Sequence, residues 1–186
     1  MRLFVAILLD QRVRRRLGEL QDRLRHSCEG VRWVKPEQLH LTVQFLGDVD
    51  DGDVALVAEA LREAATRAEP LVVTVSGCGC FPATGLVRVV WAGMTDTSGS
   101  LGRAVDAIRR ALGGVGFAPD RRAWSAHITL GRVRDGRTSD AIRRAMERYR
   151  YDALEQPVDS VVLMSSVLSA SGSAYTEVCR ATLGKG

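Results

Sequence analysis

Two short segments of the chain share a pattern that places a histidine next to a threonine. Residues 39–43 read Leu-His-Leu-Thr-Val and residues 126–130 read Ala-His-Ile-Thr-Leu, so His40 and His127 occupy matched positions. The chain has 3 histidines, and two of them lie in this repeat. A pair of histidines can serve as general acid and general base near neutral pH, because the unperturbed pKa of imidazole is about 6.5.

Strand geometry indicates how each motif presents its side chains. Residues two apart on a β-strand point to the same face, so Thr42 shares a face with His40 and Thr129 shares a face with His127. The aliphatic residues between them point into a core. Two such strands facing each other would present two imidazoles and two hydroxyls to one small anion. We therefore interpret the repeat as an acid–base site for phosphoryl chemistry, with both hydroxyls donating to phosphate oxygens.

Other interpretations of the same residues are weaker. A single histidine or threonine on a strand is usually structural, and only the matched pair favours a functional site. A serine hydrolase is disfavoured because the sequence lacks a Gly-x-Ser-x-Gly segment, and Ser125 is not spaced from His127 as in a triad. Two histidines without nearby carboxylates or thiolates do not complete a metal coordination shell. We therefore expect neither a metal nor another cofactor.

The composition is that of a globular chain with a modest positive charge. Its 186 residues suit one domain or two small lobes, and 46% of them are hydrophobic. The net charge is +4 and nearly all basic residues are arginines, which is compatible with an anionic substrate. The apolar run at residues 3–9 is too short to span a membrane, and basic residues follow it instead of preceding it. We expect a cytoplasmic protein with no membrane association, whose 4 cysteines are reduced.

Hydrophobic periodicity predicts helices interspersed with strands. The predicted helices are residues 11–25, 53–68, 100–112 and 139–149. The predicted strands are residues 2–9, 31–34, 38–46, 71–76, 86–92, 124–133, 159–168 and 174–183, the last two forming a hairpin around Ser171-Gly172-Ser173. No low-complexity linker divides the chain. These elements predict an α+β fold with antiparallel strand pairing.

Over nearly its whole length the sequence resembles the two-histidine phosphoesterase superfamily. Within it, the sequence resembles the RNA 2′,3′-cyclic phosphodiesterases, also called 2′-5′ RNA ligases. The matching segments are Arg2-Leu-Phe-Val-Ala-Ile, Arg32-Trp-Val-Lys-Pro-Glu-Gln-Leu-His-Leu-Thr-Val-Gln-Phe-Leu-Gly-Asp48, Phe81-Pro82, residues 88–91, His127-Ile-Thr-Leu-Gly-Arg132 and residues 175–183.

The resemblance implies one domain over residues 1–186, built of two lobes related by a pseudo-twofold axis. Antiparallel sheets would form a central groove, with helices packed outside and one His-x-Thr motif in each lobe. The implied reaction hydrolyses 2′,3′-cyclic phosphate ends of RNA to 2′-phosphates, with His40 as proton donor and His127 as proton acceptor. In reverse, an RNA 5′-hydroxyl would replace water and form a 2′-5′ linkage. The implied partners are RNA ends or small cyclic nucleotides, and we expect a monomer.

Two alternatives stay open. A member of the same superfamily would open another substrate, such as ADP-ribose 1″,2″-cyclic phosphate or a 2′-5′ oligonucleotide. A non-catalytic module that binds RNA ends would use both histidines only as phosphate ligands. This second alternative predicts binding without turnover, and it is disfavoured because arginine serves pure phosphate binding better.

Arg132 is the further residue that we assign to phosphate binding. It lies five residues after His127, so strict alternation places it on the opposite face. The superfamily usually has arginine at this position, and a turn or bulge at Gly131 would swing it toward the phosphate. The superfamily also usually has proline at Ala126 and phenylalanine at Trp124, so this chain departs there.

Other residues near the motifs have less decisive patterns. Phe45 alternates with aliphatic residues and is expected in the core, whereas Trp33 and Trp124 either pack or stack on a base. Arg14-Arg15-Arg16 are expected on a solvated helix face. Arg121-Arg122 precede the second motif and are interpreted as a contact for RNA backbone.

Overall fold

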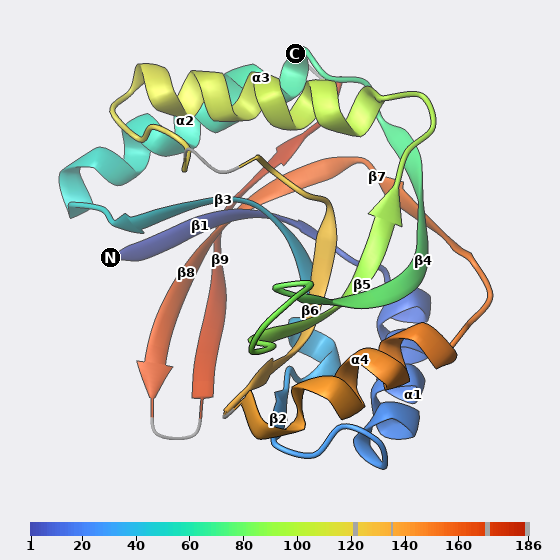
Figure 1. Cartoon of the computed structure of the whole chain (residues 1–186). Coiled ribbons are helices and arrows are strands. Elements are labelled where there is room, and N and C mark those ends of the chain that lie inside the picture. Colours follow the sequence, from blue (N-terminus) through green and yellow to red (C-terminus); the bar gives the residue numbers. More distant parts are fainter. Residues whose placement is uncertain (121–122, 135, 170–171, 185–186) are drawn as a thin grey trace.

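The computed structural model describes residues 1–120, 123–134, 136–169 and 172–184 (Figure 1). The helices are α1 (Gln11–Arg25), α2 (Val54–Thr66), α3 (Ser100–Gly114) and α4 (Ser139–Arg148), with short 3-10 turns at Pro36–Gln38, Asp51–Asp53 and Gly136–Thr138. The strands are β1 (Arg2–Leu8), β2 (Val31–Trp33), β3 (His40–Asp48), β4 (Leu71–Phe81), β5 (Val89–Thr95), β6 (His127–Val133), β7 (Leu154–Val158), β8 (Ser160–Ser169) and β9 (Gly172–Thr182).

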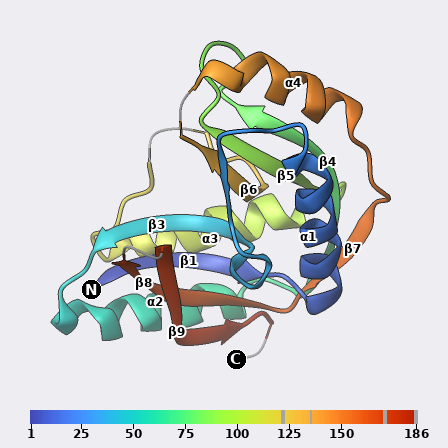
Figure 2. The same cartoon turned by 90° about the horizontal axis from the view of Figure 1, so that it is seen from below.

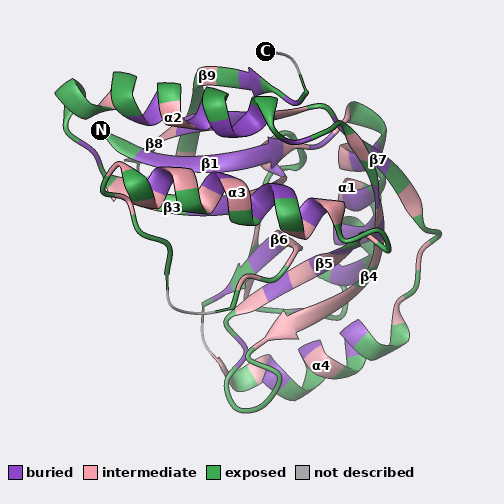
Figure 3. Ribbon diagram, turned by 90° about the horizontal axis from the view of Figure 1, so that it is seen from above, coloured by how far each residue is buried: buried purple, intermediate pink, exposed green. Residues whose placement is uncertain are grey.

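Within the described residues, the strands form one antiparallel sheet in the order β7-β4-β5-β6-β3-β1-β8-β9, and β2 pairs with β6. Helices α2 and α3 pack together against the half that contains β3, β8 and β9, and α4 packs on β4 in the other half (Figures 1 and 3). Figure 2 shows from below that α4 lies with β4 and β5 in one half, while α2 and α3 lie with β1, β3, β8 and β9 in the other. The predicted α+β class with antiparallel pairing is confirmed.

Strand β1 is buried on both faces, which explains its unbroken apolar sequence. Leu3, Val5 and Ile7 lie in the main core, under the helices. Phe4 and Ala6 point the other way, into a second cluster completed by Val162, Met164, Leu8 and Tyr175. This second cluster therefore forms an apolar floor on the face of the sheet that the helices leave open. Among the described helices, none is long and apolar enough to cross a membrane.

The structure corrects the prediction in the second half of the sheet. Strand β7 was missed, although it pairs with β4 at the sheet edge; its Pro157 is typical of edge strands and weakens the signal. Strand β4 continues to Phe81 because a register shift between Val75 and Cys78 absorbs Gly77, whose φ is +66°. Strand β5 accordingly begins three residues later than predicted, at Val89.

The predicted strand boundaries near the motifs also change. The strand predicted over residues 38–46 begins at His40, since Pro36–Gln38 forms a 3-10 turn. The strand predicted over residues 124–133 begins at His127. Each histidine is therefore the first residue of its strand. Ser171, in the predicted turn of the closing hairpin, lies outside the described residues.

Leu41→Ala tests whether the junction of β3 and β6 is a packed core. Leu41 is 0% exposed and pairs with Ile128, so we expect truncation to lower the free energy of unfolding by about 2–5 kcal/mol. The matched control is Leu56→Ala on α2, where the leucine is 47% exposed and the expected loss is only about 0.5 kcal/mol. Denaturant unfolding measures both, and equal losses would contradict this packing.

Candidate active site

The two motifs meet where β3 and β6 lie side by side. These antiparallel strands are joined through the residue pair Leu41–Ile128, and both side chains are fully buried in the core. The flanking residues of each strand point to the open face. In this register His40 lies level with Thr129, and Thr42 lies level with His127. His40 and His127 are therefore diagonal neighbours on the two strands. Such neighbours are about 7–8 Å apart, which leaves room for one phosphate between the two imidazoles.

Each imidazole is held by the same kind of backbone contact, to the carbonyl oxygen of the residue two positions earlier. The Nδ1 of His40 lies 2.7 Å from the carbonyl oxygen of Gln38, and the Nδ1 of His127 lies 2.9 Å from that of Ser125. A carbonyl oxygen only accepts, so each Nδ1 carries a hydrogen and donates it. The Nε2 atom of each ring is therefore the one that gains or loses a proton. This is the arrangement that paired acid–base catalysis requires.

An aromatic ring meets each imidazole nearly at a right angle. Tyr175 contacts His40 at 5.5 Å between ring centroids and 89° between planes. Phe81 contacts His127 at 5.2 Å and 87°. Phe4 also lies 5.0 Å from His40, from the apolar floor, and Phe81 packs on Trp91 at 5.2 Å. These contacts restrict both imidazoles, and no sequence pattern singled out Tyr175 or Phe81 for this role.

A bulge follows each motif at the same position. Strand β3 carries an extra residue, Val43, between the pairs Ala6–Thr42 and Val5–Gln44. Strand β6 carries Leu130 between the pairs Trp91–Thr129 and Val90–Gly131. A bulge reverses the alternation of the residues that follow it. The residue five positions after each histidine therefore turns to the open face.

These bulges decide the placement of Phe45 and Arg132. Phe45 is 65% exposed, so its prediction as a core residue is wrong; Gln44 takes the buried position and donates to the Phe117 carbonyl oxygen at 2.6 Å. Arg132 is exposed while Val133 is buried, so the arginine shares the open face with His127. Strict alternation fails at both positions for the same physical reason.

The surroundings of His40 disfavour its charged form. Burial lowers its pKa most, and the positive charges of Arg14 and Arg132 lower it further, whereas the hydrogen bond to Gln38 acts in the opposite direction. Free His40 is therefore neutral over a wider pH range than an exposed histidine. An anion in the groove would favour the imidazolium form and offset these effects.

Trp124 links the segment before the second motif to the first motif. Its indole Nε1–H donates to the carbonyl oxygen of Thr42 at 3.1 Å, a bond that the phenylalanine usual in the superfamily does not make. The carbonyl oxygen of Ala126 accepts from the Met94 amide at 3.3 Å, and a proline at Ala126 would keep that acceptor. The departure at Trp124 thus adds a hydrogen bond between the segment that precedes β6 and strand β3.

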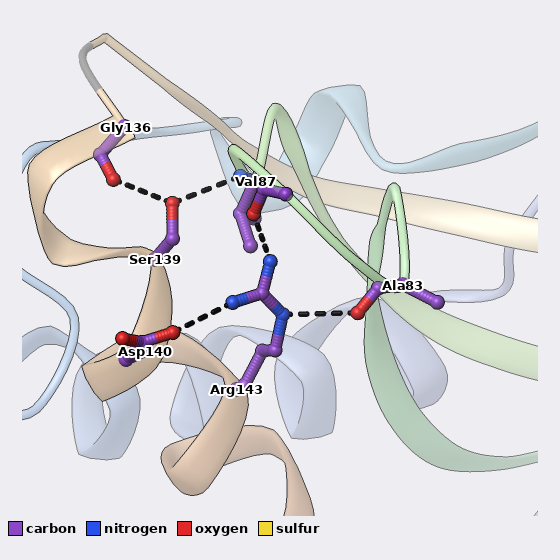
Figure 4. A network of polar contacts seen from close by, with 7 residues as sticks. Ala83, Val87, Gly136, Ser139, Asp140 and Arg143 are labelled. Atoms are coloured by element: carbon purple, nitrogen blue, oxygen red, sulfur yellow. Dashed lines mark hydrogen bonds and ion pairs between the residues drawn. The ribbon is translucent and has the colours of Figure 1, made fainter.

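The loop that follows Phe81 is fastened to α4 (Figure 4). Arg143 Nε donates to the Ala83 carbonyl oxygen at 2.9 Å, and its guanidinium also contacts the Gly85 carbonyl oxygen and the Asp140 carboxylate. Ser139 Oγ accepts from the Val87 amide at 2.9 Å. These bonds hold the loop next to the ring that contacts His127.

The remaining predicted residues take several positions. Trp33 packs against the core, and the guanidinium of Arg25 lies 5.6 Å from its ring centroid. Arg15 and Arg16 are exposed as expected, but Arg14 is half-buried, so its prediction as a solvated residue is wrong. Arg121 and Arg122 lie outside the described residues. Among the described residues, no three His, Cys, Asp or Glu side chains form a group able to hold a metal ion.

Known proteins match this chain in both of its halves. The model of the family described as LigT like phosphoesterase matches residues 7–91 and 93–175, and each stretch contains one His-x-Thr motif. A Methanothermobacter thermautotrophicus protein named RNA 2′,3′-cyclic phosphodiesterase is 32% identical over 180 residues, covering 95% of this chain and 96% of that protein. A Thermus thermophilus protein of the same name is 32% identical over 182 residues, covering 95% and 87%.

Solved structures share the fold. A crystal structure of a Thermus thermophilus protein has a TM-score of 0.80 at 28% identity and covers 99% of this chain and 98% of its own. The crystal structure of Escherichia coli LigT in apo form has a TM-score of 0.76 at 25% identity, with coverage of 99% and 98%.

The titration of His40 can be followed directly by NMR. We expect its midpoint below about 6.5, because burial and two arginines disfavour the imidazolium ion, and we expect inorganic phosphate to raise the midpoint. The variants His26→Gln and His127→Gln assign the three histidine signals. A midpoint at or above about 6.5 without phosphate would contradict the described electrostatics.

Proposed function

The chain belongs to the LigT-like phosphoesterase family, and from this premise we propose that it hydrolyses 2′,3′-cyclic phosphate ends of RNA to 2′-phosphates without a bound metal. One observation carries the proposal. Two imidazoles, each with its Nδ1–H held by a carbonyl oxygen, flank one small space on adjacent strands. The curated relatives named RNA 2′,3′-cyclic phosphodiesterase support the choice of substrate.

The proposed reaction is an in-line displacement at phosphorus. His127 Nε2 accepts a proton from water while the water oxygen bonds to phosphorus. The bond from phosphorus to the ribose 3′-oxygen breaks, and His40 Nε2 donates a proton to that oxygen. The hydroxyls of Thr42 and Thr129 and the guanidinium of Arg132 bind the non-bridging phosphate oxygens. With an RNA 5′-hydroxyl in place of water, the same displacement forms a 2′-5′ linkage and releases the ribose 3′-hydroxyl.

We also propose the domain organisation, the substrates, the oligomeric state and the cellular location of the protein. Residues 1–186 act as one domain of two lobes, each of which contributes one His-x-Thr motif, and the continuous sheet supports this. The substrates are RNA ends or small cyclic nucleotides, and the protein acts as a monomer. Four cysteines without disulfides support a cytoplasmic location.

The activity test uses a short RNA with a 2′,3′-cyclic phosphate end, in excess EDTA. We expect turnover by the wild type and 2′-phosphate as the product, read by phosphorus NMR. His40→Ala and His127→Ala should each lower kcat/KM by about a hundred- to ten-thousandfold, the usual contribution of a positioned acid or base.

His26→Ala is the matched control, because His26 is exposed and its imidazole hydrogen-bonds the Asp22 carbonyl oxygen of its own helix. It should keep wild-type activity. Binding of the RNA without turnover by the wild type would favour the non-catalytic module. Turnover of only ADP-ribose 1″,2″-cyclic phosphate or a 2′-5′ oligonucleotide would redirect the substrate assignment.

The pH dependence tests which histidine is the acid. If His40 must be protonated, activity falls as pH rises through its pKa, which is lowered in the free protein. The alkaline limb of kcat/KM should therefore lie at lower pH than the limb of kcat, because bound phosphate raises the pKa in the complex. Arg132→Gln should move the limb of kcat/KM to higher pH. A flat profile between about pH 5 and 8 would overturn the assignment.

A further inference from the structure

A cavity of about 380 Å³ lies where the end of β1, the start of β8, strand β7 and helix α1 meet. Its walls include Leu8, the residue that pairs with His40 across β1 and β3, together with Ser160 on β8 and Arg14 on α1. Gln156, Pro157 and Val158 of β7 complete the wall beside β1 and β8. Through Leu8, the cavity adjoins the active site at His40.

Arg14 has hydrogen-bond donors to spare at this cavity. Its Nε is buried without a hydrogen-bond partner among the described residues, so a ligand would bind the terminal nitrogens, of which Nη1 makes only a long 3.4 Å contact with the Glu37 carbonyl oxygen. No carboxylate of the described residues forms an ion pair with it. A half-buried guanidinium in this state is stabilised by an anion.

The other charged groups at the cavity already have partners. Arg180 binds both carboxylate oxygens of Glu177, at 3.1 and 2.6 Å. Asp10 caps α1 and accepts from the Val13 amide at 2.7 Å, and Asp159 accepts from Ser160 Oγ at 2.9 Å. Arg14 is therefore the charged group of this cavity that is best placed to recognise a ligand. Its charge already acts on His40, whose pKa it lowers.

We propose that this cavity is a second phosphate subsite, in which Arg14 binds the phosphate on the 5′-oxygen of the nucleotide whose cyclic phosphate is opened. The inference rests on the proposed function, in which the ribose oxygen leaves on the His40 side. The nucleoside then extends over β1, and its 5′-phosphate meets the cavity. The enzyme accordingly selects RNA ends over mononucleosides, because only a chain carries that second phosphate.

The test compares two substrates that differ by one phosphate. Adenosine 2′,3′-cyclic phosphate lacks the 5′-phosphate, and its 5′-phosphorylated form carries it. For the wild type we expect kcat/KM to be about ten- to a hundredfold higher for the phosphorylated substrate, the factor of one or two charge-assisted hydrogen bonds. Arg14→Gln should reduce this ratio to about 1. The ratio cancels any effect of Arg14 on His40, because both substrates use the same histidine.

Arg15→Gln is the matched control on the exposed face of the same helix, and it should keep the wild-type ratio. A wild-type ratio near 1, or an unchanged ratio in Arg14→Gln, overturns the subsite while leaving the proposed function intact. If neither substrate is turned over, the proposed function fails, and calorimetric titration with adenosine 5′-monophosphate decides the subsite. Weaker binding by Arg14→Gln than by Arg15→Gln then supports it, and equal binding rejects it.

Discussion

The backbone pair between Leu41 and Ile128 is the constraint on which the site depends. The two side chains are buried in the core where the lobes meet, so the residues on either side of each must face the open groove. One antiparallel contact therefore aligns four polar side chains around one point. The carbonyl oxygens of Gln38 and Ser125, each two residues before a histidine, then fix the imidazole orientation in both lobes.

The two motif strands have the same backbone course, but they present different side chains to the groove. Each motif is followed by a bulge, and the residue that it exposes is an aromatic ring in one lobe and a guanidinium in the other, Phe45 and Arg132. Burial patterns along both strands agree from the histidine to this residue. The two sides of an approximately symmetric groove therefore differ, so the groove can distinguish the two ends of an asymmetric substrate. The chemistry of the groove follows from this difference as much as from the matched histidines.

Much of the fold and the centre of the site could be predicted from sequence. The spacing of apolar residues, every second residue in a strand and every third or fourth in a helix, indicates which face is buried. Strand geometry alone places Thr42 beside His40 and Thr129 beside His127, but the pairing of β3 with β6 in one sheet, which brings all four to one face, could not be predicted from it. Phe45 was misplaced because a bulge leaves no reliable signal in a single sequence, and only the resemblance suggested that Arg132 turns inward. Tyr175 and Arg14 reach the site region through tertiary contacts between distant segments, which local patterns do not encode.

The most direct measurement is a crystal structure of the protein with inorganic phosphate. We expect one phosphate between the motifs, with the Nε2 atoms of His40 and His127 on opposite sides, each about 2.6–3.2 Å from a phosphate oxygen. The hydroxyls of Thr42 and Thr129 should contact the same ion. A phosphate bound by only one histidine, or imidazoles turned so that Nδ1 faces the ion, would contradict the claim that the two histidines act together on one phosphorus.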